Sequence, residues 1–483
     1  MTLVFVGAPS RLLSQAGAPV AAPLPCGTRV LPASADSLDV AMVKMMSARQ
    51  MPGLSLAIVE RGRVRAVRAY GWADLESCVP ATDSSLFGIG SISKQFTAVG
   101  ALLLVQAGKI SLDDSITRWL PEGTGVWDGI TVRHLLTNTS GIPDYPGDDH
   151  KYPRFPLDRA SSPTTPDLLR HVAAAPLNFR PGDDWAYSNT GFLVLSVLVE
   201  RVSSEPFPDY MRTHVFRPLG MTRTRFYSPT ELIPGRATPY HVDCAGAVTH
   251  GPFISDQFSH WGDMGILSTA SDMARWSVAM DSVRLLSPAL WTQMWTPVRL
   301  NQGWSYPYGF ALHVDHLIGR TAVWHTGSFR VGYTAMFQRY PDIGLTAVVM
   351  TNHYGCSFQA SALNDEAARI VHPEIAPPDN LAERTDPQPV LTRSLLLLLQ
   401  GADEAHGAIR TTAAFRTLVL PGWRPSAPPT ALRFVQCTTT PATNPSALGS
   451  SVEQECVYHS VPDIGSLIFF LTPRQDLAGI AWW

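Results

Sequence analysis

This chain has few lysines, a net charge close to zero and no long apolar run. Only four of its 37 basic residues are lysines, and the formal net charge of the 483 residues is −3. A net charge this small gives no electrostatic reason to expect nucleic acid or an anionic membrane as a partner. The longest leucine run, Leu395–Leu399, is far too short to cross a bilayer. We therefore expect neither a nucleic-acid partner nor stable insertion in a membrane.

Cysteine is also sparse, and no two cysteines have the spacing of a metal site or a redox pair. Cys437 and Cys456 fall in one apparently β-rich region and could form a disulfide in an oxidising compartment. A free buried thiol is the equally acceptable state for each of the six, which are Cys26, Cys78, Cys244, Cys356, Cys437 and Cys456. The histidines lack a ligand spacing such as H-E-x-x-H, so we expect no metal site. We also expect no organic cofactor.

The first 35 residues are interpreted as a leader or a disordered segment. Thr2–Val6 is apolar and precedes a stretch rich in Ala, Pro and Gly, but the basic start of a full secretory signal is missing. This pattern is similar to an incomplete secretory signal. We therefore predict a periplasmic or secreted protein, with a cytoplasmic location as the alternative.

The body of the chain predicts a folded protein of two or three domains, since 45% of the residues are hydrophobic and 16% are charged. A helix near 36–49 and a β-hairpin precede a long stretch of mainly helical patterns at about 112–300. The expected strands are 54–60, 63–70, 308–314, 322–324, 333–339 and 345–351, and a closing helix is expected at 358–371. This order predicts an α/β (α+β) fold, with one antiparallel sheet built from both ends of segment 36–371, flanked by helices and interrupted by a large inserted helical domain.

The composition of residues 372–483 indicates a linker followed by a C-terminal domain. Residues 372–390 are rich in Pro and Asp and are interpreted as a linker, and residues 391–483 cluster β-formers and predict a small β-rich C-terminal domain. Inside the insertion, Asp144–Thr165 is rich in Pro, Asp and Tyr and is expected to form an exposed loop. Several aromatic residues could rim a substrate cleft or pack at a domain interface: Tyr145, Tyr152, Trp295, Trp304, Tyr306 and Tyr308.

The first candidate catalytic residues are Ser91 and Lys94, at the start of an apolar helix that should end near Gly108. Residues three apart project from one face of a helical turn. A serine hydroxyl needs a group that takes its proton, and a lysine in a dry site can lose its charge and accept that proton. A spacing of S-x-x-K alone also fits a surface helix, but Lys94 is the only lysine with a serine three positions before it.

Two later motifs offer partners for Ser91. Tyr187 could act as a base if a nearby lysine cation favours its phenolate, and Asn189 has both donors and an acceptor for a substrate amide or for Lys94. Taken alone, the two residues fit a packed tyrosine and a helix N-cap equally well.

The third motif is the stretch His325, Thr326, Gly327 and Ser328. Its glycine permits close approach of a substrate to the backbone. The N–H of Ser328 could then face the N–H of Ser91 across a reacting carbonyl and form an oxyanion hole with it.

In this order the motifs resemble S-x-x-K, Y-x-N and K/H-x-G of the serine β-lactamase and penicillin-binding protein superfamily. The most similar part is the class C β-lactamase-like branch, which includes esterases, D-aminopeptidases and DD-peptidases. Stretches 134–141, 216–221 and 265–272 also resemble that family. The resemblance covers roughly residues 36–371 and does not include the C-terminal segment.

The resemblance implies a role for each motif residue. Ser91 would be the acylated nucleophile, Lys94 and Tyr187 the proton-handling pair, and Asn189 a contact for substrate and lysine. The residues that would line the acyl group are His325, Thr326, Gly327 and Ser328.

One residue departs from the β-lactamase pattern. His325 stands where that motif usually has lysine, and a histidine with an ordinary pKa of about 6.5 is mostly neutral at pH 7. Arg330 lies close enough in sequence to supply the missing charge, or it belongs to a solvated loop.

We therefore expect a serine hydrolase that cleaves ester or amide bonds of a small molecule or short peptide through an acyl-enzyme on Ser91. One alternative is a β-lactamase or DD-carboxypeptidase acting on penicillins or peptidoglycan peptides. Another is a non-catalytic scaffold, which would need none of the four residues Ser91, Lys94, Tyr187 and Asn189. The sequence does not predict an oligomeric state.

Overall fold

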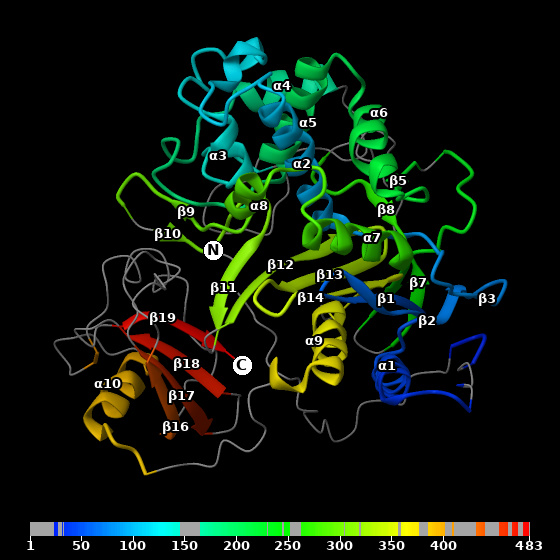
Figure 1. Ribbon diagram of the computed structural model, residues 1–483, viewed down its shortest axis with the longest axis vertical. Coiled ribbons are helices and arrows are strands. Elements are labelled where there is room, and N and C mark those ends of the chain that lie inside the picture. Colours follow the sequence, from blue (N-terminus) through cyan, green and yellow to red (C-terminus); the bar gives the residue numbers. More distant parts are fainter. Residues whose placement is uncertain are drawn as a thin grey trace.

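The structure is a computed structural model of the 483-residue chain (Figure 1). It describes residues 24–27, 31, 33–144, 165–228, 230–243, 246–251, 262–303, 305–317, 320–355, 359–375, 385–400, 408–409, 431–439, 454–461, 466–471 and 477–482. Within these ranges, no helix is both long enough and apolar enough to cross a membrane.

A seven-stranded sheet forms the centre of the molecule, and every neighbouring pair of its strands is antiparallel. Its strand order is β11-β12-β13-β14-β1-β2-β3, so the hairpin β1–β2 from the start of the chain joins strands that begin at His313 or later. The bounds are β1 Gly53–Glu60, β2 Arg63–Asp74, β3 Val79–Pro80, β11 His313–Leu317, β12 Arg320–Phe329, β13 Tyr333–Tyr340 and β14 Leu345–Thr351. The predicted sheet built from both ends of the segment is confirmed.

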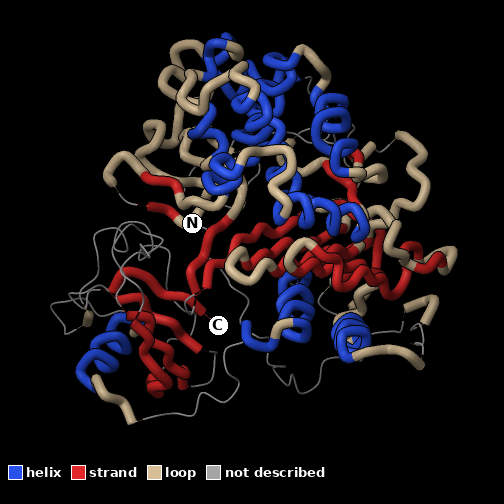
Figure 2. The backbone as a smooth tube through the Cα atoms, in the orientation of Figure 1, coloured by secondary structure: helices blue, strands red, loops and turns tan. Residues whose placement is uncertain are grey.

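Strand β1 shows why the sheet is covered on both faces. Successive side chains of a strand point to opposite faces. Leu54, Leu56 and Ile58 belong to the apolar cluster shared with α1 (Ser37–Ser47) and α9 (Gln359–Val371), whereas Ala57 and Val59 belong to the cluster on the other face. A strand buried on both faces is apolar along most of its length. Figures 1 and 2 show α1 and α9 on one side of the sheet and α7 (Ala270–Asp281), with the inserted helices, on the other.

The inserted segment contains most of the α-helices of the described residues. They are α3 Val132–Leu136, α4 Thr165–Ala173, α5 Asn189–Ser203, α6 Phe207–Met211, α7 and α8 Pro288–Met294, and helix α2 (Ser93–Gln106) precedes the segment. Helices α2 and α5 pack against each other above the sheet (Figure 1). The fold class is confirmed.

Short strands run through the insertion and through the segments that flank it, so this part of the chain is not purely helical. Two three-stranded sheets have the orders β4-β8-β5 and β15-β6-β7, and β9 pairs with β10. Their strands are β4 Phe87–Gly88, β5 Arg225–Phe226, β6 Tyr240–Val242, β7 Val248–His250, β8 Ile266–Ser268, β9 Val298–Arg299, β10 Ser305–Tyr306 and β15 His353–Gly355. Strands of two or three residues are too short to show a period of two, so the sequence pattern did not reveal them.

The C-terminal part of the chain forms a separate four-stranded antiparallel sheet of order β16-β17-β18-β19. The bounds are β16 Ala431–Thr439, β17 Gln454–Val461, β18 Ser466–Leu471 and β19 Leu477–Trp482. Helix α10 (Pro389–Leu399) contains the leucine run and contacts β16. Much of the predicted linker lies outside the described residues, so the boundaries at 372 and 390 stay predictions.

A disulfide that the sequence did not reveal joins Cys26 to Cys78. The two residues are 52 positions apart, a spacing without a signature in the sequence. Cys456 is also disulfide-bonded, and Cys437 lies opposite it in the pairing of β16 with β17. Cys244 and Cys356 lie outside the described residues.

Candidate active site

The turn before α2 brings Ser91 against strand β12. Residues Gly90–Ile92 form a short 3-10 helix that continues into α2, so Ser91 and Lys94 share one face. Gly90 has a φ of +51°, and a Cβ at this position would lie 2.5 Å from the backbone nitrogen of Ser328. A Cβ on Gly327 would lie 2.0 Å from the carbonyl oxygen of Ile89. Glycine at both positions therefore allows the nucleophile turn and β12 to touch.

Lys94 is completely buried, and its ammonium has an acceptor for each of its three hydrogens. Its Nζ lies 3.1 Å from Ser91 Oγ, 2.8 Å from Asn189 Oδ1 and 2.9 Å from the backbone carbonyl oxygen of Asp263. Burial lowers the pKa of Lys94, and the negative charges of Asp263 and Asp144 partly offset that effect. The predicted contact between Asn189 and Lys94 is present.

These contacts also fix the direction in which a neutral Lys94 would point its lone pair. A backbone carbonyl oxygen and an amide oxygen can only accept hydrogen bonds. After Lys94 loses a proton, its two remaining hydrogens can be donated to Asp263 and Asn189. The lone pair is then left for Ser91, the third neighbour. The geometry suits removal of the Ser91 hydroxyl proton by Lys94.

Tyr187 lies beside both residues but not as the phenolate considered from the sequence. Lys94 Nζ lies 4.7 Å from the centroid of the Tyr187 ring, so the cation faces the ring. The hydroxyl is buried without a well-formed hydrogen bond to any residue in the described ranges, although Ser91 is near enough to lower its pKa slightly. Burial outweighs that effect and raises the pKa of Tyr187 well above 10, so the phenol is protonated at neutral pH. Tyr187 is therefore neutral in the resting site, and its part in proton transfer stays a prediction.

His325 is 2% exposed and neutral. Its Nδ1 lies 2.6 Å from the carbonyl oxygen of Thr326, so Nδ1 carries the proton and Nε2 is left as an acceptor, 3.5 Å from the Tyr308 hydroxyl. Burial lowers the pKa of His325 well below 6.5, and the nearby His313 and Lys94 lower it further. The ring lies 5.8 Å from that of Tyr187, between centroids. His325 thus brings a hydrogen-bond acceptor, not a cation, to the site.

The rest of the β12 motif lies beside the turn that carries Ser91. Thr326 and Ser328 are half-buried, and Ser328 packs on Gly90, the residue before Ser91. Pairing of the Ser91 and Ser328 N–H groups around a carbonyl oxygen stays a prediction. Arg330, considered as a carboxylate anchor, is exposed after the end of β12.

The predicted aromatic residues divide between the site and the interior. Tyr308 is fully buried next to His325, and Tyr306 stacks on Trp185 with ring centroids 4.1 Å apart. Trp295 is half-buried and packs against the core and Trp291. Tyr145, Tyr152 and Trp304 lie outside the described residues.

Two acidic residues of the site were missed from the sequence. Asp144 was assigned to an exposed loop but is 9% exposed, and it accepts hydrogen bonds from Asn189 and Thr190. Asp263 is fully buried, and its carbonyl oxygen accepts from Lys94. The Pro- and Tyr-rich surroundings of Asp144 concealed it. For Asp263, the only sequence feature that could have indicated a place in the site is its position just before the stretch 265–272, which resembles the family.

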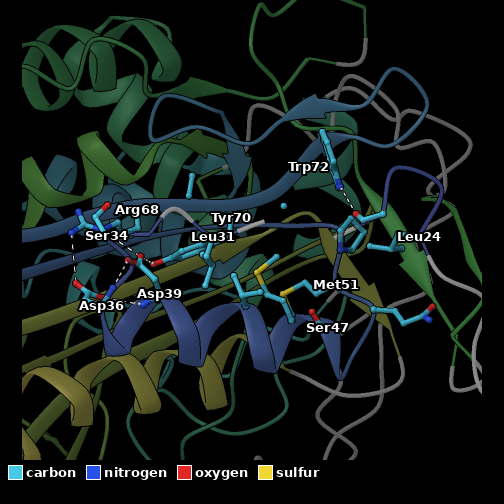
Figure 3. Close-up of a pocket in the computed structure, with 17 residues that line it drawn as sticks. Leu24, Leu31, Ser34, Asp36, Asp39, Ser47, Met51, Arg68, Tyr70 and Trp72 are labelled. Atoms are coloured by element: carbon cyan, nitrogen blue, oxygen red, sulfur yellow. Dashed lines mark hydrogen bonds and ion pairs between the residues drawn. The ribbon is translucent and has the colours of Figure 1, made fainter. Parts of the chain in front are cut away.

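A cavity of about 570 Å³ lies elsewhere, on the face of the sheet that α1 covers (Figure 3). Met46, Met51 and Leu31 line its apolar part, and Asp39 and Arg68 line a polar end. Ser91 does not line it. This cavity is therefore separate from the candidate catalytic residues.

The fold and the site together define a class of enzyme. A serine hydroxyl next to a buried lysine, at the start of a helix beside an antiparallel sheet, is the arrangement of a serine hydrolase that works by acyl transfer. The chain belongs to the Beta-lactamase family, whose sequence profile matches residues 38–371. The predicted class, a β-lactamase-like serine hydrolase, is confirmed.

Several known proteins are similar to this chain. Penicillin-binding protein 4* of Bacillus subtilis (strain 168) is 33% identical over 322 residues, which cover 63% of this chain and 68% of that protein. A D-aminopeptidase of Gluconobacter oxydans (strain 621H) is 29% identical, covering 64% of this chain and 58% of that protein. Esterase EstB of Burkholderia gladioli is 34% identical, covering 42% of this chain and 54% of that protein.

Solved structures agree on the fold. The D-amino acid amidase of Ochrobactrum anthropi SV3, complexed with L-phenylalanine amide, has a TM-score of 0.54 and 25% identity, covering 70% of this chain and 98% of that one. The octameric penicillin-binding protein homologue of Pyrococcus abyssi has a TM-score of 0.58 and 22% identity, covering 90% of each chain. At 22% identity, the similarity to the Pyrococcus abyssi protein is evidence for a shared fold alone.

Proposed function

We propose that this protein hydrolyses esters or amides through an acyl-enzyme formed on Ser91, with Lys94 as the base. The observation that carries the proposal is the 3.1 Å separation of Ser91 Oγ from a fully buried Lys94 Nζ, whose other two neighbours can only accept hydrogen bonds.

The reaction then has two halves. Neutral Lys94 takes the Ser91 proton while Oγ attacks the carbonyl carbon, and the leaving group departs with a proton returned from Lys94 by way of the Tyr187 hydroxyl. A water molecule next attacks the ester on Ser91 and gives its proton to the same pair. The acid product leaves, and Ser91 regains its proton.

The neutral His325 supports substrates that lack a carboxylate next to the reacting bond. Its Nδ1 hydrogen is donated to the Thr326 carbonyl oxygen and its Nε2 lies 3.5 Å from the Tyr308 hydroxyl, so the uncharged ring offers no cation to a carboxylate. Relatives named D-aminopeptidase and Esterase EstB agree with neutral esters and amino-acid amides. We infer small esters, amides or short peptides with a free amino group as the substrate class.

A second candidate is action on penicillins or peptidoglycan peptides. It is favoured by the 33% identity to Penicillin-binding protein 4* and opposed by the neutral His325. Both candidates suit a periplasmic or secreted protein. The Cys26–Cys78 disulfide supports that location, since structural disulfides persist in oxidising compartments.

An activity panel tests the proposal. Wild-type protein and Ser91→Ala are compared on p-nitrophenyl acetate, D-amino-acid amides and nitrocefin, and covalent labelling by a fluorophosphonate is followed by mass spectrometry. We expect wild-type turnover of the ester or the amides, a label on the peptide that contains Ser91, and loss of both in Ser91→Ala. A label on another residue, or undiminished turnover by the alanine variant, would refute the assignment.

A further inference from the structure

Asp144 places a carboxylate at the start of helix α5. It accepts hydrogen bonds from the backbone N–H of Thr190 at 3.1 Å, the Thr190 hydroxyl at 3.4 Å and the Asn189 amide nitrogen at 3.0 Å. All three contacts are donors, the pattern that an ionised carboxylate requires, because it can only accept. Burial, together with the negative charge of Asp263, raises the pKa of Asp144 to about 7, and the contacts with Thr190, Lys94 and Asn189 offset only part of this effect.

The side-chain amide of Asn189 lies between Asp144 and Lys94. Its nitrogen donates to Asp144 and its oxygen accepts from Lys94 Nζ at 2.8 Å. If the amide were rotated by half a turn, its oxygen would face the carboxylate and its NH₂ would face the ammonium. Both contacts would then pair like with like, so the Asp144 carboxylate selects the orientation that the structure shows.

The orientation matters most when Lys94 is neutral. In the observed orientation, Asn189 Oδ1 accepts a hydrogen bond from the amine of Lys94, and the lone pair of the amine stays available for the Ser91 proton. In the rotated orientation the NH₂ of Asn189 would donate to that lone pair and compete with Ser91. A base whose lone pair is occupied cannot accept the serine proton.

Asp144 also contributes charge. The groups that face Lys94 are Ser91 and Asn189, the rings of Tyr187 and Phe192, and the Asp263 carbonyl oxygen. Asp144 and Asp263 are the acids whose negative charges raise the pKa of Lys94, and the nearby His325 is neutral. Asp144 therefore acts on Lys94 in two ways, through the amide and through its charge.

We propose that Asp144 is a positioning residue for Lys94: it holds Asn189 in the orientation that keeps the amine lone pair available to Ser91, and it balances part of the buried charge of Lys94. This inference rests on the proposed function, in which Lys94 is the base. Nothing in the three motifs assigns Asp144 a role.

The scarcity of lysine makes a direct test practical. The chain has only Lys44, Lys94, Lys109 and Lys151, so ¹³Cε-lysine labelling gives few NMR signals. Loss of one signal in Lys94→Met assigns Lys94. Its titration is then followed in wild type and in Asp144→Asn, together with the pH profile of kcat/KM on p-nitrophenyl acetate.

We expect the titration midpoint of Lys94 to fall by about one pH unit or more in Asp144→Asn, because a buried unit charge that only the Asn189 amide separates from Lys94 acts through an effective dielectric of about 20. The rising limb of kcat/KM should move to lower pH by the same amount. The plateau should fall at least about tenfold, because a neutral amide no longer dictates the orientation of Asn189. Asp144→Ser, which keeps one acceptor oxygen for the helix, should behave alike and replaces Asp144→Asn if that variant does not fold.

Asp272 provides the matched control. It is 1% exposed and accepts from the Thr224 N–H at 2.8 Å and the Thr224 hydroxyl at 2.9 Å, at the start of α7. Asp272→Asn should lower the melting temperature but leave the Lys94 midpoint and the kcat/KM profile at their wild-type positions. An unchanged Lys94 midpoint in both Asp144 variants, or an equal shift in Asp272→Asn, would overturn the proposal. Full turnover by Ser91→Ala combined with the expected Lys94 shift would instead contradict the proposed function alone.

Discussion

Replacing Lys94 by methionine tests the base assignment and the buried charges together. Methionine has a similar length and no charge, so it removes the three hydrogen bonds of Nζ with little change in packing volume. If Lys94 is the base, kcat/KM on p-nitrophenyl acetate should fall at least about a hundredfold, the usual contribution of general base catalysis.

The same substitution should reduce stability in a pH-dependent way. Removing one partner of a buried ionic contact costs about 3–5 kcal/mol, because the remaining charge is left uncompensated. Without Lys94, the pKa of Asp144 loses one of the influences that lower it and rises further above the unfolded value of about 3.9. The folded variant then holds a proton that the unfolded chain has released. Its stability therefore falls as pH rises from about 4 to the raised pKa of Asp144, by about 1.4 kcal/mol for each unit of added shift.

The assay is urea unfolding of wild type and Lys94→Met at about pH 5 and about pH 7.5, with kcat/KM measured on the same samples. We expect the loss of unfolding free energy to be larger at the higher pH. A variant that keeps more than about a tenth of the wild-type kcat/KM would refute the base assignment. A loss that is equal at both pH values would refute the claim that Lys94 compensates a buried carboxylate.

Three further outcomes are expected. Tyr187→Phe should lower kcat/KM about a hundredfold. The double variant with Lys94→Met should lose less activity than the product of the two single fold-losses, because the residues act as one unit. A double variant whose fold-loss equals that product would show that the two residues act independently. The wild-type pH profile of kcat/KM should show no step near pH 6.5, because burial lowers the pKa of His325 well below that value. The substitution His325→Lys should raise the ratio of kcat/KM for nitrocefin to kcat/KM for p-nitrophenyl acetate by a factor of about five (about 1 kcal/mol). An unchanged ratio would show that this position does not face the substrate carboxylate. A chain that ends after residue 377 should still fold and should still react with a fluorophosphonate, because Ile375 packs with α1 and α9. Insoluble protein would show that the C-terminal sheet completes the core.

The sequence allowed the sheet and the nucleophile to be predicted because both have local signals. Strands β1, β13 and β14 are segments of seven or eight residues rich in apolar and β-forming side chains, and their order around a helical stretch was enough to place them in one sheet. Ser91 and Lys94 have a fixed spacing on one helical turn, so their contact follows from helix geometry once the helix forms.

The missed features depend on contacts between segments distant in sequence. Asp144 is buried because the start of α5 supplies donors to it, and neither its neighbours nor its spacing indicated that contact. The protonated state of Tyr187 likewise results from burial, which the sequence cannot report. Cys26 and Cys78 meet because the segment before α1 lies along the end of β2, where Trp72 donates to the Gly27 carbonyl oxygen.

The buried network also bears on the scaffold alternative. A buried ionic group can often be replaced by apolar side chains of similar volume without loss of stability, and sometimes with a gain. Lys94 on α2, Asn189 on α5, Asp144 and Asp263 meet only when the inserted helices are docked beside the sheet, so they do not direct the local folding of any one segment. A protein that used this fold only as a scaffold would gain nothing from placing a buried cation 3.1 Å from a serine hydroxyl. Acyl transfer needs that contact, and for this reason we favour the enzyme over the scaffold.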